Sequence, residues 1–182
     1  MLNAIKSAVP KQADSTEDAV SMLVSCHARI RHFTAVALRL AFAESVPAAE
    51  IAQAAEGVHR YFTVALPLHE ADENESLHPR LRQSAPEGEL AGPAADAMVE
   101  QHKSIDEIVE RLVPICELLK ANPTLHGSVA EELRQLATAL QQMFDSHLKL
   151  EEETIFPAMR KYLTREQLGE IEREMRDRRS IA

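Results

Sequence analysis

The sequence predicts an all-α protein that folds as an up-down-up-down antiparallel four-helix bundle with a short additional C-terminal helix. Composition is the first observation: the 182 residues include five Gly, two Tyr and no Trp, whereas Ala, Leu, Glu and Gln are abundant. Such unbranched side chains lose little rotamer freedom in a helix and favour helix over strand. Helix-breaking residues and apolar periodicity are the other two observations, and they divide the chain into four long helical segments and a short one.

The first two helices are expected over residues 17–44 and 48–76. Cap-type side chains at positions 14–16 precede the first helix, and Pro67 is expected to kink the second. Residues 77–93 then collect three prolines and two glycines, which indicate a long loop. Because only a short connection separates the first two helices, we expect them to be antiparallel neighbours.

The third helix is expected to start after Pro93 and to run to about residue 120, with a kink at Pro114. The fourth is expected over residues 128–156, because the spacing of Ser128 and Glu131 is that of a capping box. The same spacing at Thr164 predicts the start of the short fifth helix. Along each long segment, apolar residues recur at steps of three and four, which places one stripe on each helix.

The length of the chain suits a single domain with a sizeable core. We expect this domain to span residues 1–182. It divides into an N-terminal arm (1–16), the four-helix bundle (17–156) and a C-terminal extension (157–182).

Net charge and cysteine content bear on the partners and the location of the protein. The formal net charge of -9 disfavours binding to nucleic acid or to an anionic membrane surface, and a basic run at residues 173–179 is expected to be a solvated helix face. The two cysteines lack CxxC spacing, which fits a reducing compartment. We find neither a signal peptide nor a membrane-spanning segment in the sequence, and we expect a cytoplasmic protein.

Each of the four apolar stripes contains one histidine. A lone histidine on such a stripe is more often a core residue with a hydrogen-bonded neighbour than a metal ligand. At 1.5 Å per residue, however, an up-down-up-down chain places all four at about the same level near one end of the bundle. The four are His27, His69, His102 and His147.

The other four histidines fail this test of position. His32 points about 140° away from His27, and His59 lies about 80° off the position aligned with His69. His78 and His126 lie in or beside expected loops.

Two glutamates complete the cluster. In HEADE (69–73) and HLKLE (147–151), Glu73 and Glu151 each follow a stripe histidine at i+4, so that histidine and glutamate face the same point. An isolated pair of this kind is usually an ordinary surface contact. A carboxylate can also bridge two cations, and a neutral imidazole supplies one lone pair, so the six side chains together suit two divalent metals.

The sequence does not assign a single role to the acidic residues next to these ligands. Glu152 and Glu153 rotate away from the stripe, and we expect them to be solvated or hydrogen-bonded to a metal ligand. Glu70 and Asp72 are expected to behave in the same way, with solvation as the default.

Four stretches carry a resemblance to a known family: HARIR from residue 27, LHEADENESLHP from 68, EQHKSID from 100 and HLKLEEETIFP from 147. They resemble the hemerythrin-like, or HHE cation-binding, family. The resemblance implies a single hemerythrin-like domain with a non-haem di-iron centre, in which the four stripe histidines are terminal ligands and Glu73 and Glu151 are bridges.

The sequence differs from the oxygen-carrying hemerythrins at two points. Those proteins have a second histidine one turn from the first on the third helix, where this chain has Met98 and Asp106. The fourth helix here has a glutamate at i+4 rather than an aspartate at i+5. These differences resemble the four-histidine, two-glutamate members, such as di-iron proteins for repair of iron-sulfur clusters under nitrosative stress.

The expected cofactor is therefore a pair of Fe ions by resemblance, while imidazole and carboxylate ligands also suit Mn or Zn. We expect a protein that binds or senses O2, NO or peroxide, in oxidative or nitrosative stress or in iron handling. A di-iron peroxidase, oxidase or NO-reducing enzyme and a metal-free structural bundle remain as alternatives. The loop at 77–92 either covers the site or is a passive connector.

Overall fold

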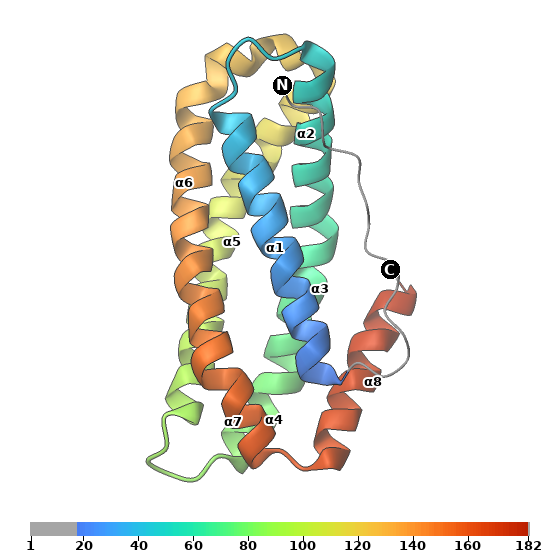
Figure 1. Ribbon diagram of the computed structural model, residues 1–182, viewed down its shortest axis with the longest axis vertical. Helices are drawn as coiled ribbons and strands as arrows, with labels where there is room; N and C mark the ends of the chain where they lie inside the picture. Colours follow the sequence, from blue (N-terminus) through green and yellow to red (C-terminus); the bar gives the residue numbers. More distant parts are fainter. Residues whose placement is uncertain (1–17, 182) are drawn as a thin grey trace.

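The computed structural model of the chain describes residues 18–181, and every regular element within this range is helical. This confirms the all-α prediction. Long helical segments lie side by side, and a shorter helix lies against one end of them (Figure 1). In chain order the elements are α1 (Ala19–Ala41), α2 (Ala48–Arg60), η1 (Tyr61–Ala65), α3 (Leu66–Ala71), η2 (Asp72–Leu77), α4 (His78–Ser84), α5 (Ala91–Ala121), η3 (Pro123–Leu125), α6 (His126–Leu150), η4 (Glu151–Ile155), α7 (Phe156–Tyr162) and α8 (Arg165–Ile181).

The helix starts differ in part from those expected. Asp18 caps α1 by accepting a hydrogen bond from the Ser21 amide at 2.8 Å, whereas the cap residues expected at 14–16 lie outside the described residues. The capping box predicted at Ser128 is wrong, because the 3-10 turn η3 leads directly into α6 at His126. The capping box at Thr164 is confirmed by reciprocal hydrogen bonds with Gln167.

Three prolines follow π-helical turns rather than simple kinks. Pro67, Pro79 and Pro157 are each the second residue of an α-helix that continues directly from η1, η2 or η4. Proline cannot donate to the carbonyl four residues earlier, and its ring crowds that carbonyl. The wider π turn contains that carbonyl in all three cases, which lets the chain remain helical. Pro114, in contrast, lies inside the continuous helix α5.

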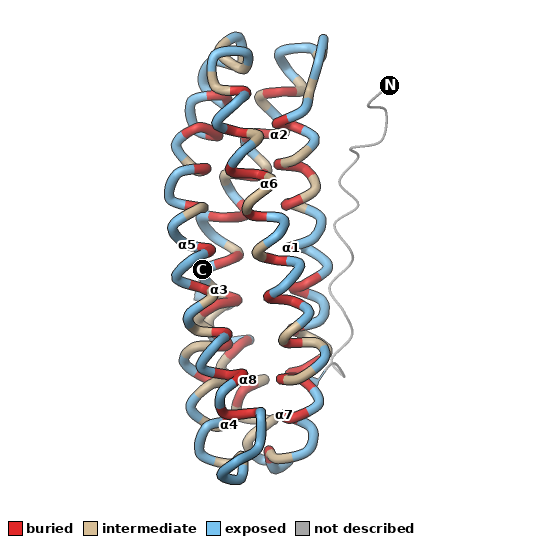
Figure 2. Tube along the Cα trace, turned by 90° about the vertical axis from the view of Figure 1, so that its left-hand side faces the viewer, coloured by how far each residue is buried: buried red, intermediate tan, exposed pale blue. Residues whose placement is uncertain are grey.

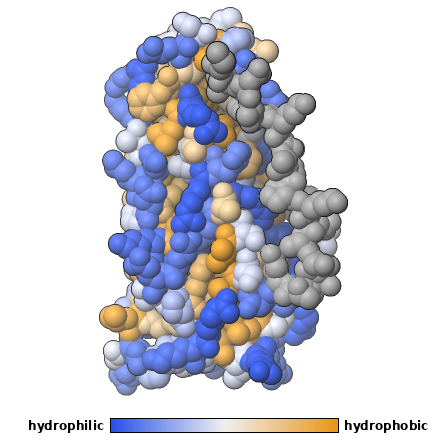
Figure 3. All heavy atoms as spheres, in the orientation of Figure 1, coloured by the Kyte–Doolittle hydropathy of each residue, from blue (hydrophilic) through white to orange (hydrophobic). Residues whose placement is uncertain are grey.

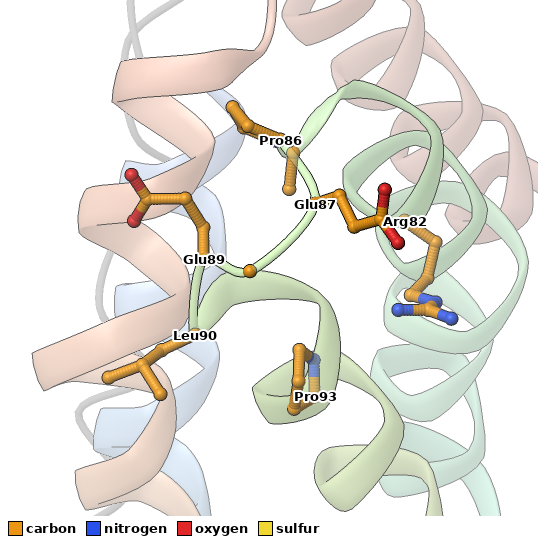
Figure 4. Close-up of a pocket in the computed structure, with 8 residues that line it drawn as sticks. Arg82, Pro86, Glu87, Glu89, Leu90 and Pro93 are labelled. Atoms are coloured by element: carbon orange, nitrogen blue, oxygen red, sulfur yellow. The ribbon is translucent and has the colours of Figure 1, made fainter.

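The long loop predicted over residues 77–92 is largely wrong. The chain stays helical to Ser84 because Leu77 and Leu81 are fully buried, and only residues 85–90 separate α4 from α5. Gly88 turns this connection with a φ of 87°, a conformation that side chains disfavour. The connection borders an open hollow of about 350 Å³, which none of the six predicted metal ligands lines (Figure 4).

Buried side chains form two apolar clusters along the bundle. We call the larger one the main core; it is formed by inward-facing residues of α1, α2, η1, α3, α5 and α6 from Ile30 to Leu148. We call the smaller one the end core; it joins the start of α1, α4, the start of α5, α7 and α8. Figure 2 shows buried positions recurring along every long helix. The four stripe histidines are buried near the boundary between the two clusters: His27, His69 and His102 each lie between main-core and end-core residues of their own segment, and His147 precedes Leu148, the last main-core residue.

The helix α8 is attached to the bundle by both apolar and charged contacts. Ile171 and Met175 are fully buried in the end core. Arg178 and Arg179 reach the two oxygens of Asp72, which is itself completely buried, at 3.1 and 2.6 Å. The expectation that the basic run is only a solvated face is therefore wrong for these two arginines.

The hydropathy of the surface and of the helices is a further feature of the fold. The face seen in Figure 3 is largely hydrophilic, with smaller apolar areas between the hydrophilic ones. No helix among residues 18–181 is both long enough and apolar enough to cross a membrane.

Candidate metal centre

The structure brings all six predicted side chains together. His27 comes from α1, His69 from α3, His102 from α5 and His147 from α6, and each is at most 2 % exposed. The two carboxylates come from π turns: Glu73 is the second residue of η2, and Glu151 is the first residue of η4. Both carboxylate residues are completely buried.

The six residues form two overlapping groups. One ligand atom each from His27, His69, Glu73 and Glu151 lies within 4.8 Å of the other three, and the same holds for Glu73, Glu151, His102 and His147. Both carboxylates are therefore common to the two groups. We call the first group the 27/69 position and the second the 102/147 position.

Every stripe histidine directs its Nε2 atom at one of the shared carboxylates. The two oxygens of Glu151 divide between the groups, with Oε2 2.9 Å from His27 Nε2 and Oε1 3.0 Å from His147 Nε2. Glu73 Oε2 lies 3.3 Å from His69 Nε2 and 3.2 Å from His102 Nε2. Each carboxylate thus faces one histidine of each position, as a bridging ligand must.

Most ligand atoms at the centre make no hydrogen bond of acceptable geometry among residues 18–181, although they lie close to one another. The Nε2 atoms of His27, His69 and His102 are buried without one, and so are both oxygens of Glu73 and of Glu151. Buried polar groups are rarely left in this condition, because each unsatisfied group costs about 1–3 kcal/mol. Seven such atoms around one point fit the requirements of a metal site, where lone pairs are satisfied by cations.

Two of the histidines, His69 and His102, are held in the neutral form that binds metals. Burial holds the pKa of His69 well below its usual range, and burial together with the nearby His147 lowers that of His102 to about 4. Both imidazoles are therefore neutral near pH 7 and keep a free lone pair.

The pKa values of Glu73 and Glu151 are shifted in opposite directions. Burial and the adjacent Glu151 carboxylate raise the pKa of Glu73 well above its usual range. Burial also acts against the Glu151 anion, but the imidazoles of His147 and His27 outweigh it and the pKa of Glu151 is lowered. Without cations, like charges at this distance leave one carboxyl protonated; two divalent ions remove that repulsion.

Three of the four histidines are oriented by a hydrogen bond at the other ring nitrogen. The Nδ1 atoms of His27, His102 and His147 contact Glu152 Oε1 at 2.8 Å, Asn74 Oδ1 at 2.8 Å and Gln101 Oε1 at 3.0 Å. These oxygens accept, so each Nδ1 carries the proton and each Nε2 is free for a metal. The Nδ1 atom of His69 is buried without a partner among the described residues.

Sequence reasoning found only part of this supporting set. The sequence left two possibilities for Glu152, a solvated side chain or one that is hydrogen-bonded to a metal ligand. Its contact with His27 supports the second. Asn74 and Gln101 were missed, although each is next in sequence to a predicted ligand. Glu70 and Asp72 make no hydrogen bond or ion pair with a ligand histidine among the described residues. Burial and the neighbouring Asp106 raise the pKa of Glu70 to about 8, and Asp72 binds the arginines of α8.

The other four histidines lie away from the centre, as expected. His59 pairs with Glu117 at 3.0 Å, and His126 bonds the Leu40 carbonyl at 2.7 Å. His32 packs edge-on against the neighbouring Phe33 ring. His78 pairs with Asp96 at 2.9 Å, although it begins the helix α4 rather than lying in a loop.

An all-helical bundle with buried, overlapping histidine and glutamate clusters defines a metal-binding protein. The family model described as the hemerythrin HHE cation-binding domain matches the chain over residues 18–113 and again over residues 93–181. The chain therefore belongs to the hemerythrin HHE cation-binding family. A comparison with curated protein sequences gave no match.

Proposed function

We propose that this protein is a non-haem di-iron protein that binds or senses O2, NO or peroxide. The observation that carries the proposal is the convergence of seven unsatisfied ligand atoms, from five of the six buried side chains, on two positions that share two carboxylates. Family membership supports iron, and imidazole with carboxylate ligands suits it. A metal-free structural bundle does not account for the unsatisfied atoms.

The six ligands leave room for a small molecule. Each position would have two histidines and two shared carboxylates, which is fewer ligands than an octahedral ion accepts. A bound iron pair would supply the open coordination positions and the redox chemistry. The protein supplies neutral imidazoles and two anions, so two divalent ions would retain a net positive charge that favours an anionic or reducible ligand.

The arrangement of the chain around the centre is also part of the proposal. Contacts of α1 with α2 and α6, and of α5 with α2 and α6, support an up-down-up-down order within one domain. The two buried cysteines are free, which supports a reducing, cytoplasmic location.

The first test is elemental analysis of the freshly purified protein. We expect about two metal ions, mainly iron, per chain. His69→Ala combined with His147→Ala removes one ligand from each position and should abolish this content. His59→Ala is the matched control, because His59 pairs with Glu117 outside the centre; it should bind as the native chain does. Equal metal content in all three proteins would refute the proposal.

The second test separates sensing from catalysis. Azide should change the absorption spectrum of the iron-loaded protein and leave that of the double variant unchanged. Addition of NO or peroxide should then give stoichiometric binding. Sustained turnover would instead assign the enzymatic alternative, a peroxidase, oxidase or NO-reducing enzyme that uses the same centre.

A further inference from the structure

The hydrogen bonds behind the histidines differ between the two metal positions. At the 102/147 position both imidazoles are anchored at Nδ1, each by a neutral amide oxygen. At the 27/69 position only His27 is anchored, and its partner is the Glu152 carboxylate. The His69 Nδ1 atom has no partner among the residues that the structure describes.

Glu152 is itself held in place from the helix that carries His27. Arg31, one turn beyond His27 on α1, donates from Nη2 to Glu152 Oε2 at 2.9 Å. The Glu152 carboxylate therefore links α1 to η4 and receives one donor on each oxygen. Glu152 directly follows the bridging residue Glu151, so the same turn supplies a metal ligand and the partner of another ligand.

We propose that Glu152 is a positioning residue that makes the two metal positions inequivalent: the 27/69 position depends on this one carboxylate, whereas the 102/147 position has two independent amide anchors. This inference rests on the proposed di-iron function. It extends that function by assigning a role to a residue that would not itself contact a metal.

The chemistry of the partners explains the difference. A carboxylate that accepts from Nδ1–H fixes the ring and also makes Nε2 a stronger donor, because negative charge stabilises the developing imidazolium character. A neutral amide fixes the ring with less effect on donor strength. Loss of Glu152 would leave neither histidine of the 27/69 position anchored, whereas loss of Asn74 or Gln101 would leave one anchor at the other position.

The test follows metal release from the full-length protein, loaded with the metal that it carries, into a chelator. In Glu152→Ala we expect one of the two metal equivalents to leave about 10- to 100-fold faster than in the native chain, with the second unchanged. Glu152→Gln keeps an acceptor without the charge and should be intermediate. Anomalous scattering from crystals of partly depleted Glu152→Ala should place the retained ion at the 102/147 position.

Glu153→Ala is the matched control, since Glu153 is the exposed neighbour of Glu152 in the same turn. It should release both equivalents at the native rates. If the native and control proteins hold two metals and Glu152→Ala releases both at native rates, or both equally faster, the positioning role is refuted while the di-iron function stands. If the native protein holds no metal, the di-iron function itself fails.

Discussion

The main core and the end core lie on either side of the four stripe histidines, and they are built in different ways. The main core consists mostly of facing stripes of α1, α2, α5 and α6, with Tyr61 and Phe62 of the π turn η1 and Leu66 of α3 added to them. The end core collects short segments that follow π turns, together with the start of two long helices and part of α8. Packing between long helices therefore dominates on one side of the centre, and packing among short segments dominates on the other.

Because of this difference, we expect the main core to contribute mainly to the stability of the fold, and the end core also to hold the candidate metal centre in place. The π turns that carry Glu73 and Glu151 continue directly into α4 and α7, which belong to the end core. The ring of Phe156 in α7 also stacks on His27, with ring centroids 5.0 Å apart. Damage to the end core should reach the predicted metal ligands, whereas damage to the main core several turns away from the histidines should affect stability alone.

The largest expected effect compares one cavity in each core. Leu112→Ala in the main core and Met159→Ala in the end core remove side chains that are both completely buried. Each should lower the free energy of unfolding, measured in urea, by about 2–5 kcal/mol. Only Met159→Ala should also speed metal release into a chelator. Equal release from the two variants would remove the distinction between the cores.

A smaller effect concerns the attachment of α8 to the end core. Arg179→Ala removes the 2.6 Å contact to buried Asp72 but leaves Arg178 in place. We expect a loss of about 1–3 kcal/mol, because a hydrogen bond between charged groups is lost at a partly buried site. Amide hydrogen exchange in α8 should become faster.

The control for this variant is Arg173→Ala, which alters an exposed arginine of the same helix. Its stability should stay within about 0.5 kcal/mol of the native protein. If Arg173→Ala and Arg179→Ala had the same exchange rates in α8, the ion pairs with Asp72 would not be what holds this helix.

The positions of the ligands could be predicted from the sequence because they follow from helical geometry alone. Four histidines at matching heights, with Glu73 and Glu151 one turn after two of them, require only the rise and rotation of an α-helix. The structure brings these six together although both glutamates lie in π turns. Glu73 and Glu151 stand at the second and first positions of their turns, so the spacing from the histidine four residues earlier stays close to α-helical.

The features that sequence reasoning missed depend on contacts between distant segments. Residues 77–84 contain a proline and appeared to be loop, but burial of Leu77 and Leu81 in the end core outweighs the local signal. The partner of Arg179 is more than one hundred residues away in the chain. Asn74 and Gln101 could not be distinguished from other polar residues without knowing which way each imidazole ring turns.

The smallest expected effect concerns the first turn of α1, where the end core begins. The Ser21 amide donates to Asp18, which lowers the pKa of that carboxyl below its ordinary value of 3.8. A lowered pKa in the folded state stabilises the protein above the unfolded pKa, and this contribution is lost as the pH falls through the folded value. Asp18→Ala should therefore cost about 0.5–2 kcal/mol at neutral pH.

The measurement is the difference in unfolding free energy between Asp18→Ala and the native protein, taken at neutral pH and in acid. The difference should shrink as the Asp18 carboxylate becomes protonated. Asp145→Ala changes an exposed carboxylate within α6 and should show no such convergence. A difference that does not depend on pH would mean that the cap does not contribute through its charge.

The π turns also determine where the length of this chain can change. A π turn holds one residue more than an α turn, so deletion of one residue from η4 would restore regular spacing and rotate everything beyond it by about 100°. Phe156 would then leave the His27 ring, and Met159 would leave its place in the core. Residues 86–90 are all exposed and can absorb insertions or deletions. Among related chains, length variation should therefore concentrate in that connection and avoid η2 and η4.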